Sequence, residues 1–137
     1  KHCGRTRIYC LSVKCATGRP WTAALTAAET GHLVFATLHT RSAAQAVSRM
    51  AGAYGRGGAG RDALPPGYGI AGILAQRRGD GAGGAYIARE ILLHTPAVAQ
   101  LIRSGREHQL TTVMQTGAAL GMRTMEQALQ RHRRNLI

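Results

Sequence analysis

The stretch that most constrains the fold is LVFATL at Leu33–Leu38, a run dominated by apolar side chains. A run of this kind predicts a strand buried on both faces, as in the parallel sheet of an α/β domain. An apolar stripe at Ala24, Leu25 and Ala28 predicts a short helix before it, and Gly31 stands where a left-handed helix cap belongs. The segment therefore predicts a helix that leads into a central strand.

The residues after this strand predict a second helix and then an irregular region. Ser42 is suited to cap a helix that ends near Met50. Residues 51–68 hold many glycines and two adjacent prolines without an apolar period, which predicts a flexible loop. A sequence pattern typical of regular structure resumes near Ile70, and residues Ala85–Leu93 predict another strand.

The C-terminal third predicts three short helices. Thr95 and Pro96 supply an N-cap and a proline at the first helical position, and Gly105 ends this helix. Thr124 and Gln127 form a capping box that predicts the start of the last helix. The apolar positions of the three helices are, in order, Ala97, Val98, Leu101 and Ile102; then Leu110, Val113 and Met114, closed by Gly117; then Met125, Ala128 and Leu129.

Length and composition favour one domain of modest size. Of the 137 residues, 45% are hydrophobic but only 4% are aromatic, so we expect an aliphatic core with many alanines. No run approaches the roughly 18 apolar residues that span a membrane. The order of the elements predicts an α/β layer followed by a small helical tail.

The net charge of +12 raises the question of nucleic-acid binding. All but two of the 18 basic residues are arginines, and the aromatic side chains that stack on bases are scarce. We therefore do not expect nucleic acid as the main partner. A sequence rich in arginine and glycine also arises when GC-rich DNA is read in the wrong frame.

The three cysteines, Cys3, Cys10 and Cys15, lie near the N-terminus. Their spacings lack the close C-x2-C pair that usually begins a zinc site, so we expect no metal site. A disulfide is not expected in the cytoplasm.

Two segments resemble one protein family. Residues 24–44, ALTAAETGHLVFATLHTRSAA, are similar to the histidine-box region of the PilT-like type II/IV secretion ATPases, which typically contains AL-x-AAETGHLVF-x-TLHT. Residues 90–129 resemble the family's C-terminal helices, including its retraction motif and a later QTG…GM-x-T segment. The resemblance covers roughly half of the chain closely. It identifies the chain as a C-terminal fragment of a type IV pilus retraction ATPase.

The resemblance implies a partial RecA-like ATPase core with a C-terminal helical tail. It also implies ATP and Mg²⁺ in the intact protein, a homo-hexamer, and the pilus machinery of the inner membrane as partner. We then expect a cytoplasmic location, peripheral to the inner membrane. Two alternatives stay open: an assembly or secretion ATPase of the same family, and a non-enzymatic helical interaction module.

His39 and His32 are the candidate site residues of the histidine box. His39 follows the predicted strand, at the end where α/β sheets bind ligands, and an imidazole there can donate to a phosphate oxygen. His32 lies roughly 23 Å away if the stretch is fully extended, so we expect it to be structural or to face a neighbouring subunit. Both can also be ordinary strand-end histidines that bond to the backbone. The resemblance adds Thr40 as a nucleotide contact.

The family's retraction motif, AIRNLIRE, is partly kept. The first arginine of the motif is replaced by Ala99, and its closing glutamate is replaced by Ser104. We expect this helix to keep its packing and one basic contact, made by Arg103. The alternative is that Arg103 is only a solvated surface charge. The candidate motif residues are Ala97, Val98, Leu101, Ile102 and Arg103.

The sequence contains no phosphate-binding loop of the form G-x4-G-K-[ST], and residues 1–20 contain no Asp or Glu. ATP hydrolysis in this class needs both the loop and an acidic residue. We therefore expect the chain by itself to be inactive and to bind no cofactor. We divide it into a non-native-looking segment at 1–21, the C-terminal part of the ATPase core at 22–94, and a helical subdomain at 95–137.

The missing acidic residues predict a frameshift near Trp21–Ala23. Permitted codons for Lys1–Thr22, read two bases later, can spell ALREDPDILLVGEMRDRETMD, which resembles the family's acidic Walker B segment. A shift through Gly55–Gly60 can likewise spell AEEEQ. Sequencing the underlying DNA tests the idea: we expect codons that encode these acidic strings in the shifted frame, and codons that cannot do so would refute it.

Overall fold

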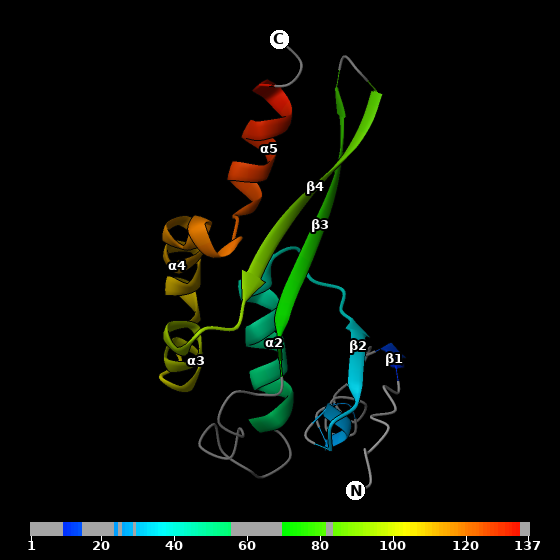
Figure 1. The fold of residues 1–137 in the computed structure, drawn as a ribbon, viewed down its shortest axis with the longest axis vertical. Helices are drawn as coiled ribbons and strands as arrows, with labels where there is room; N and C mark the ends of the chain where they lie inside the picture. Colours follow the sequence, from blue (N-terminus) through cyan, green and yellow to red (C-terminus); the bar gives the residue numbers. More distant parts are fainter. Residues whose placement is uncertain are drawn as a thin grey trace, which may run out of the picture. The chain divides into compact units, whose positions relative to one another are not determined.

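The computed structural model describes residues 10–14, 24, 26–28, 30–55, 70–81 and 84–134. They fall into two compact units, Lys1–His39 and Thr40–Ile137. Both strands and helices occur, as the predicted α/β class requires (Figure 1). The division into segments at residues 21 and 94 stays a prediction.

The first unit contains a parallel two-stranded sheet. Strand β1 (Cys10–Lys14) pairs with strand β2 (Leu33–Thr37), so that Cys10 lies opposite Leu33. Gly31 has a φ of 89°, as expected for the left-handed residue that ends the preceding helical turn. The prediction of β2 and of the glycine cap is therefore confirmed. Strand β1 was not predicted, because its segment shows no periodic pattern.

The burial predicted for β2 is wrong. Leu33 and Phe35 expose 47% and 59% of their surface. A parallel strand is buried on both faces only where further layers of structure cover the sheet. In the part of this unit that the structure describes, β2 pairs with β1 alone. Apolar composition identified the strand, whereas the surrounding layers decide how much of it is exposed.

The second unit is built on an antiparallel hairpin of β3 (Gly72–Gly81) and β4 (Gly84–Leu93), which pair along their whole length. Around the hairpin lie the helices α2 (Ala43–Gly55), α3 (Pro96–Arg103), α4 (Leu110–Thr116) and α5 (Met125–Arg134), with the short 3-10 helices η2 (Glu107–Gln109) and η3 (Gly117–Leu120) on either side of α4. Helix α5 lies along β4 near the hairpin turn, and α2 packs against the opposite end of the hairpin (Figure 1).

The two faces of the hairpin differ in burial. The face that meets α2 and α5 is the more buried one, and its buried members are Ala75, Ala88, Glu90 and Leu92. The other face carries the exposed side chains of Leu74 and Ile87. Strand β4 confirms the strand predicted at Ala85–Leu93. Strand β3 was not predicted, because the polar run at 76–78 hides its alternation.

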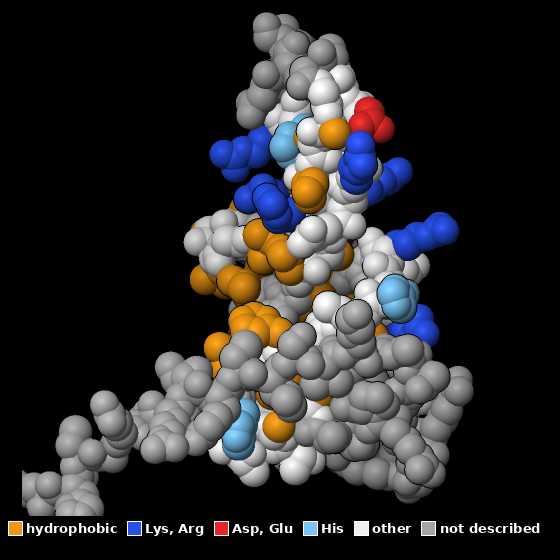
Figure 2. Space-filling model, turned by 90° about the vertical axis from the view of Figure 1, so that its right-hand side faces the viewer, with side chains coloured by type: hydrophobic (Ala, Val, Ile, Leu, Met, Phe, Trp, Pro, Cys, Tyr) orange, Lys and Arg blue, Asp and Glu red, His pale blue; other side chains and the backbone are white. Residues whose placement is uncertain are grey.

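Arginine side chains stand out on the upper half of the face shown in Figure 2, where the hairpin lies. Arg77, Arg78 and Arg89 of the hairpin are exposed. Arg78 Nη2 lies 3.9 Å from Asp80 Oδ1, and both side chains are largely exposed. An exposed ion pair at this distance contributes little to stability. These hairpin arginines therefore lie on a solvated surface.

Helix α2 begins where the sequence predicts but ends later. The Gln45 amide donates to Ser42 Oγ over 3.2 Å, which confirms the N-cap. The helix continues to Gly55, so the loop predicted at 51–68 is wrong for its first residues; the rest of that loop lies outside the described residues. Ala51 is buried beside Met50, and this packing outweighs the low helix propensity of Gly52.

The C-terminal helices start at the predicted caps. Thr95 Oγ1 accepts from the Val98 amide at 3.3 Å, and Gly105 has a φ of 67° after α3. The capping box before α5 is closed: the Thr124 amide donates to Gln127 Oε1 over 3.0 Å, and the Gln127 amide donates to Thr124 Oγ1 over 3.3 Å. The largest fully buried side chains join α3 to α4; they are Val98, Leu110 and Met114.

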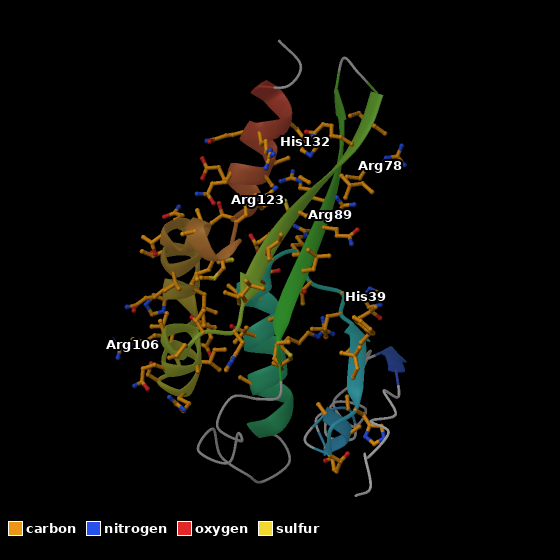
Figure 3. The ribbon with its side chains drawn as sticks, in the orientation of Figure 1. His39, Arg78, Arg89, Arg106, Arg123 and His132 are labelled. Atoms are coloured by element: carbon orange, nitrogen blue, oxygen red, sulfur yellow. The ribbon has the colours of Figure 1, made fainter. Side chains whose placement is uncertain are left out.

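An aromatic contact holds α5 against the hairpin. The rings of Tyr86 and His132 stack with centroids 4.7 Å apart and an interplanar angle of 25°, and His132 lies on α5 beside the hairpin in Figure 3. Tyr86 pairs with Gly79 across the hairpin, and a Cβ at Gly79 would come within 2.5 Å of the Tyr86 ring. Gly79 therefore leaves the space that the ring occupies.

We predict that Gly79→Ala lowers the free energy of unfolding by about 1–3 kcal/mol, because the added methyl group displaces the Tyr86 ring. Gly52→Ala is the matched control, since a Cβ at Gly52 meets nothing within 4 Å. The control should raise stability by about 0.5–1 kcal/mol. Urea unfolding followed by circular dichroism measures both, and equal effects would contradict the role given to Gly79.

Candidate functional site

The loop after β2 carries the first candidate residue, His39. Strand β2 ends at Thr37, and only Leu38 separates it from His39, so the histidine lies just past the carboxyl end of the strand. Its side chain is exposed and is labelled in Figure 3. Ligands of open α/β sheets bind at this end of the strands. An exposed imidazole there can donate a hydrogen bond to a phosphate oxygen.

Thr40 and Arg41 lead from this loop into α2. Thr40 is half-buried. The Arg41 amide donates to Gln45 Oε1 over 3.1 Å, and Ser42 caps the helix. The backbone that follows His39 is therefore fixed to the first turn of α2 by side-chain hydrogen bonds.

His32, the second candidate, has local partners. Its Nδ1 lies 3.1 Å from Thr30 Oγ1 and 3.2 Å from the carbonyl oxygen of Ala27. Its amide donates to the same carbonyl over 3.0 Å. These groups belong to the turn before β2, at the opposite end of the strand from His39. The contacts fit a residue that fixes this turn.

The residues of the retraction motif divide into buried or half-buried positions, Val98, Leu101 and Ile102, and exposed ones, Ala97 and Arg103. Arg103 Nη2 donates to Gln100 Oε1 over 3.2 Å on the exposed side of α3. The motif therefore supplies core side chains on one face of this helix and an arginine on its solvent face.

The QTG…GM segment has a structural explanation. A Cβ at Gly117 would come within 2.1 Å of Met122 Cε and 3.3 Å of Met122 Cβ. Gly121 has a φ of 88°, a conformation that favours glycine. The two glycines let the chain turn from α4 towards α5 with the buried Met122 packed over Gly117. In the described structure this segment builds the turn before the capping box.

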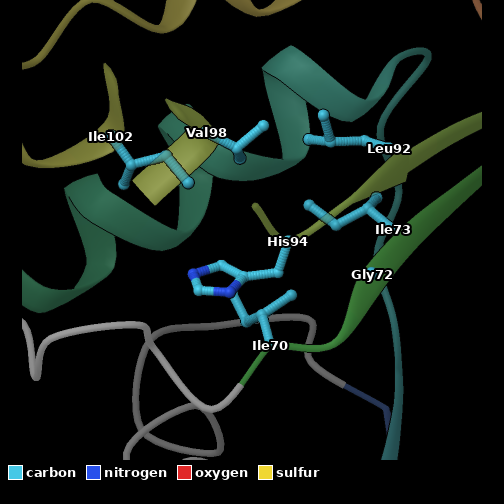
Figure 4. Close-up of a pocket in the computed structure, with 7 residues that line it drawn as sticks. All are labelled: Ile70, Gly72, Ile73, Leu92, His94, Val98 and Ile102. Atoms are coloured by element: carbon cyan, nitrogen blue, oxygen red, sulfur yellow. The ribbon is translucent and has the colours of Figure 1, made fainter. Parts of the chain in front are cut away.

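An apolar pocket lies between the open end of the hairpin and α3 (Figure 4). His94 Nε2 is buried without a hydrogen-bond partner among the described residues. The space open to water is only about 10 Å³, close to the lower limit for one water molecule, so a nucleotide does not fit. The lining residues are Ile70, Gly72, Ile73, Leu92, His94, Val98 and Ile102.

A wider, open groove of about 520 Å³ lies between α2 and η2. It is lined by Ala44, Gln45, Ser48, Arg49, Glu107 and His108. The candidate residues of the histidine box and of the retraction motif do not line it, so it does not extend the predicted site.

Metal sites and membrane spans are both absent from the described ranges of the structure. There, no group of three or more His, Cys, Asp and Glu side chains is placed to hold a metal ion. Cys10 lies in β1, whereas Cys3 and Cys15 fall outside these ranges. The helices within them lack the length and apolar character of a membrane span.

Glu90 carries a buried carboxylate that was not predicted as a site residue. This side chain is 5% exposed and lies on the face of β4 that meets α2 and α5. One oxygen accepts from the Ala43 amide over 2.6 Å, and the other accepts from the Met125 amide over 3.1 Å. The available indication was an acidic residue between Ala88 and Leu92, at an inward position of the alternation.

Comparisons with known proteins agree with the resemblance. A family model described as a type II/IV secretion system protein matches residues 20–77. The chain is 47% identical to the uncharacterized protein YggR of Escherichia coli (strain K12), over 78% of this chain and 33% of that protein. It is 43% identical to a twitching motility protein of Neisseria gonorrhoeae, over 78% of this chain and 29% of that protein.

Among solved structures, the chain is similar to the pilus retraction motor PilT with bound ADP. The TM-score is 0.65 at 29% sequence identity, over 90% of this chain and 36% of that one. The chain thus spans about a third of the length of the relatives it matches. Over that length, the chain belongs to the PilT-like branch of the type II/IV secretion ATPases.

Proposed function

We propose that the chain is the C-terminal part of a motor ATPase that drives type IV pilus retraction and twitching motility, and that it does not hydrolyse ATP by itself. The observation that carries the proposal is the place of His39, just past the carboxyl end of β2. The 43% identity to a twitching motility protein and the likeness to a pilus retraction motor support it. We propose that the chain alone does not hydrolyse ATP because its sequence contains no phosphate-binding loop.

In the intact protein, His39 donates a hydrogen bond to a phosphate oxygen, and the hydroxyl of Thr40 contacts the same nucleotide. Phosphoryl transfer depends mainly on positioning and on stabilisation of charge, so a fixed donor at this point favours the reaction. ATP with Mg²⁺ supplies the phosphoryl group whose transfer drives the motor. His32 holds the turn before β2, in line with its contacts to Thr30 and Ala27.

The active assembly we propose is a homo-hexamer in the cytoplasm, peripheral to the inner membrane, where it works with the pilus machinery. In such a ring, reactions between subunits move domains as rigid bodies. The helices from Pro96 onward transmit this movement, and Arg103 offers a charged contact on their solvent face.

The segment 1–21 is proposed to be out of frame. The family match begins at residue 20, next to the predicted frameshift, which supports this proposal. Strand β1 (Cys10–Lys14) overlaps the apolar LLVG of the shifted string, and in the given frame it contains the apolar residues Leu11 and Val13.

We predict that the isolated chain hydrolyses no ATP above the buffer background in a phosphate-release assay. Residues 22–137, joined to the part of the Neisseria gonorrhoeae protein that they do not match, should restore hydrolysis. In this chimera, His39→Ala should lower kcat about 100-fold. A loss of this size is typical when an enzyme loses one hydrogen-bond donor that stabilises the charge developing in the transition state. His32→Ala is the matched control and should change kcat far less, since its contacts are to its own turn.

Equal losses from the two histidine substitutions, or hydrolysis by the isolated chain, would contradict the proposal. The chimera also separates the two motor types in a strain that lacks its own retraction motor. Restored twitching supports retraction, whereas a change in the number of surface pili without twitching supports an assembly motor.

Helix α3 offers a separate test of the retraction motif. Ile102→Ala should lower the free energy of unfolding by about 2–4 kcal/mol, because it removes a buried side chain. Arg103→Ala should change it by less than about 0.5 kcal/mol, since its partner Gln100 is also exposed. In the chimera, Arg103→Ala should nevertheless reduce twitching; unchanged twitching would make this arginine a solvated surface charge.

A further inference from the structure

The buried carboxylate of Glu90 joins three elements of the second unit. It projects from β4, and each oxygen accepts a backbone amide from the first residue of a helix: Oε1 from Ala43 of α2, Oε2 from Met125 of α5. The N-terminus of a helix carries partial positive charge, which favours a carboxylate. Two hydrogen bonds and two helix ends thus compensate the cost of burying the charge.

Glutamate is the side chain that suits this place. Glutamine offers one acceptor oxygen, so its amide nitrogen would face one of the two N–H donors. Aspartate has two acceptor oxygens with the same spacing, but it is shorter by one methylene group, so its carboxylate would not reach the two amides from the β4 backbone. The arrangement therefore depends on both the charge and the length of Glu90.

Hydrogen bonds at the first turn of α2, joined by the helix backbone, connect Glu90 to the backbone that follows His39. Ala43 begins α2, and in the same turn the Gln45 amide donates to Ser42 Oγ. Gln45 Oε1 accepts from the Arg41 amide, and only Thr40 stands between Arg41 and His39. The position of this backbone depends on the first turn of α2. That turn and the start of α5 both donate to the carboxylate of Glu90.

We propose that Glu90 is a positioning residue that links the helical tail to Thr40 and Arg41, the end of the loop that leads into α2. Displacement of the start of α5 moves the carboxylate, and the carboxylate moves the first turn of α2 with the backbone of Arg41. The inference rests on the proposed function, in which this loop contacts nucleotide. Because coupling between two sites is reciprocal, the same link transmits a change at the loop to α5.

Hydrogen exchange of single backbone amides, measured by NMR on the full chain, tests the link without nucleotide. Glu90→Gln should speed exchange at Arg41, Ala43 and Met125 by about 10-fold or more, because a charge-assisted hydrogen bond is lost. Each matched control removes one helix cap without touching Glu90. Ser42→Ala should loosen the start of α2 alone, and Gln127→Ala should loosen the start of α5 alone.

Met125→Pro is the deciding variant. Proline is tolerated at the first helical position, so this substitution removes the α5 donor while α5 persists, as circular dichroism would verify. The link predicts faster exchange at Arg41 and Ala43 in Met125→Pro, with no such change in Gln127→Ala. Exchange at Arg41 that stays unchanged in Met125→Pro, or that rises equally in Gln127→Ala, would overturn the proposal. No nucleotide is used, so this outcome is distinct from a failure of the His39 experiment.

Discussion

A carboxylate in an apolar interior is costly unless its oxygens are bonded, and the way Glu90 is bonded organises the second unit. The first amides of any helix lack partners within that helix, and here two helices meet this need with one side chain. As a result, the starts of α2 and α5 are held at the same point of β4, although they lie on either side of it in the sequence. The remaining helices, α3 and α4, are joined by the buried Val98, Leu110 and Met114.

Small residues allow the elements to approach one another closely. The buried positions include Ala43 and Ala46 of α2, Ala75 and Ala88 of the hairpin, and Ala128 of α5, in agreement with the expected alanine-rich core. Glycine has the same effect at two points, where Tyr86 lies over Gly79 and Met122 lies over Gly117. With few aromatic side chains to fill space, close backbone contact gives the packing density that interiors require.

Predictions from sequence succeeded where structure depends on neighbours in the chain. The caps at Ser42, Thr95 and Thr124 were found because a cap is formed within one helical turn. The position of His39 after β2 was found because an apolar run ends at a definite residue. The failures concern partners elsewhere: the pairing of β1, the polar strand β3, the extension of α2 to Gly55, and the exposure of Leu33 and Phe35 on β2.

The sequence by itself determined where α2, α3 and α5 begin, where β2 and β4 lie, and the family, because each of these is written in local patterns or in a long stretch of matching residues. Tertiary structure alone decided the role of Glu90, since its two donors lie 47 and 35 positions away along the chain. It also separated the retraction motif into core and surface positions. Burial and long-range hydrogen bonds depend on which segments are in contact in the folded chain, and these tertiary contacts cannot be read from a single sequence.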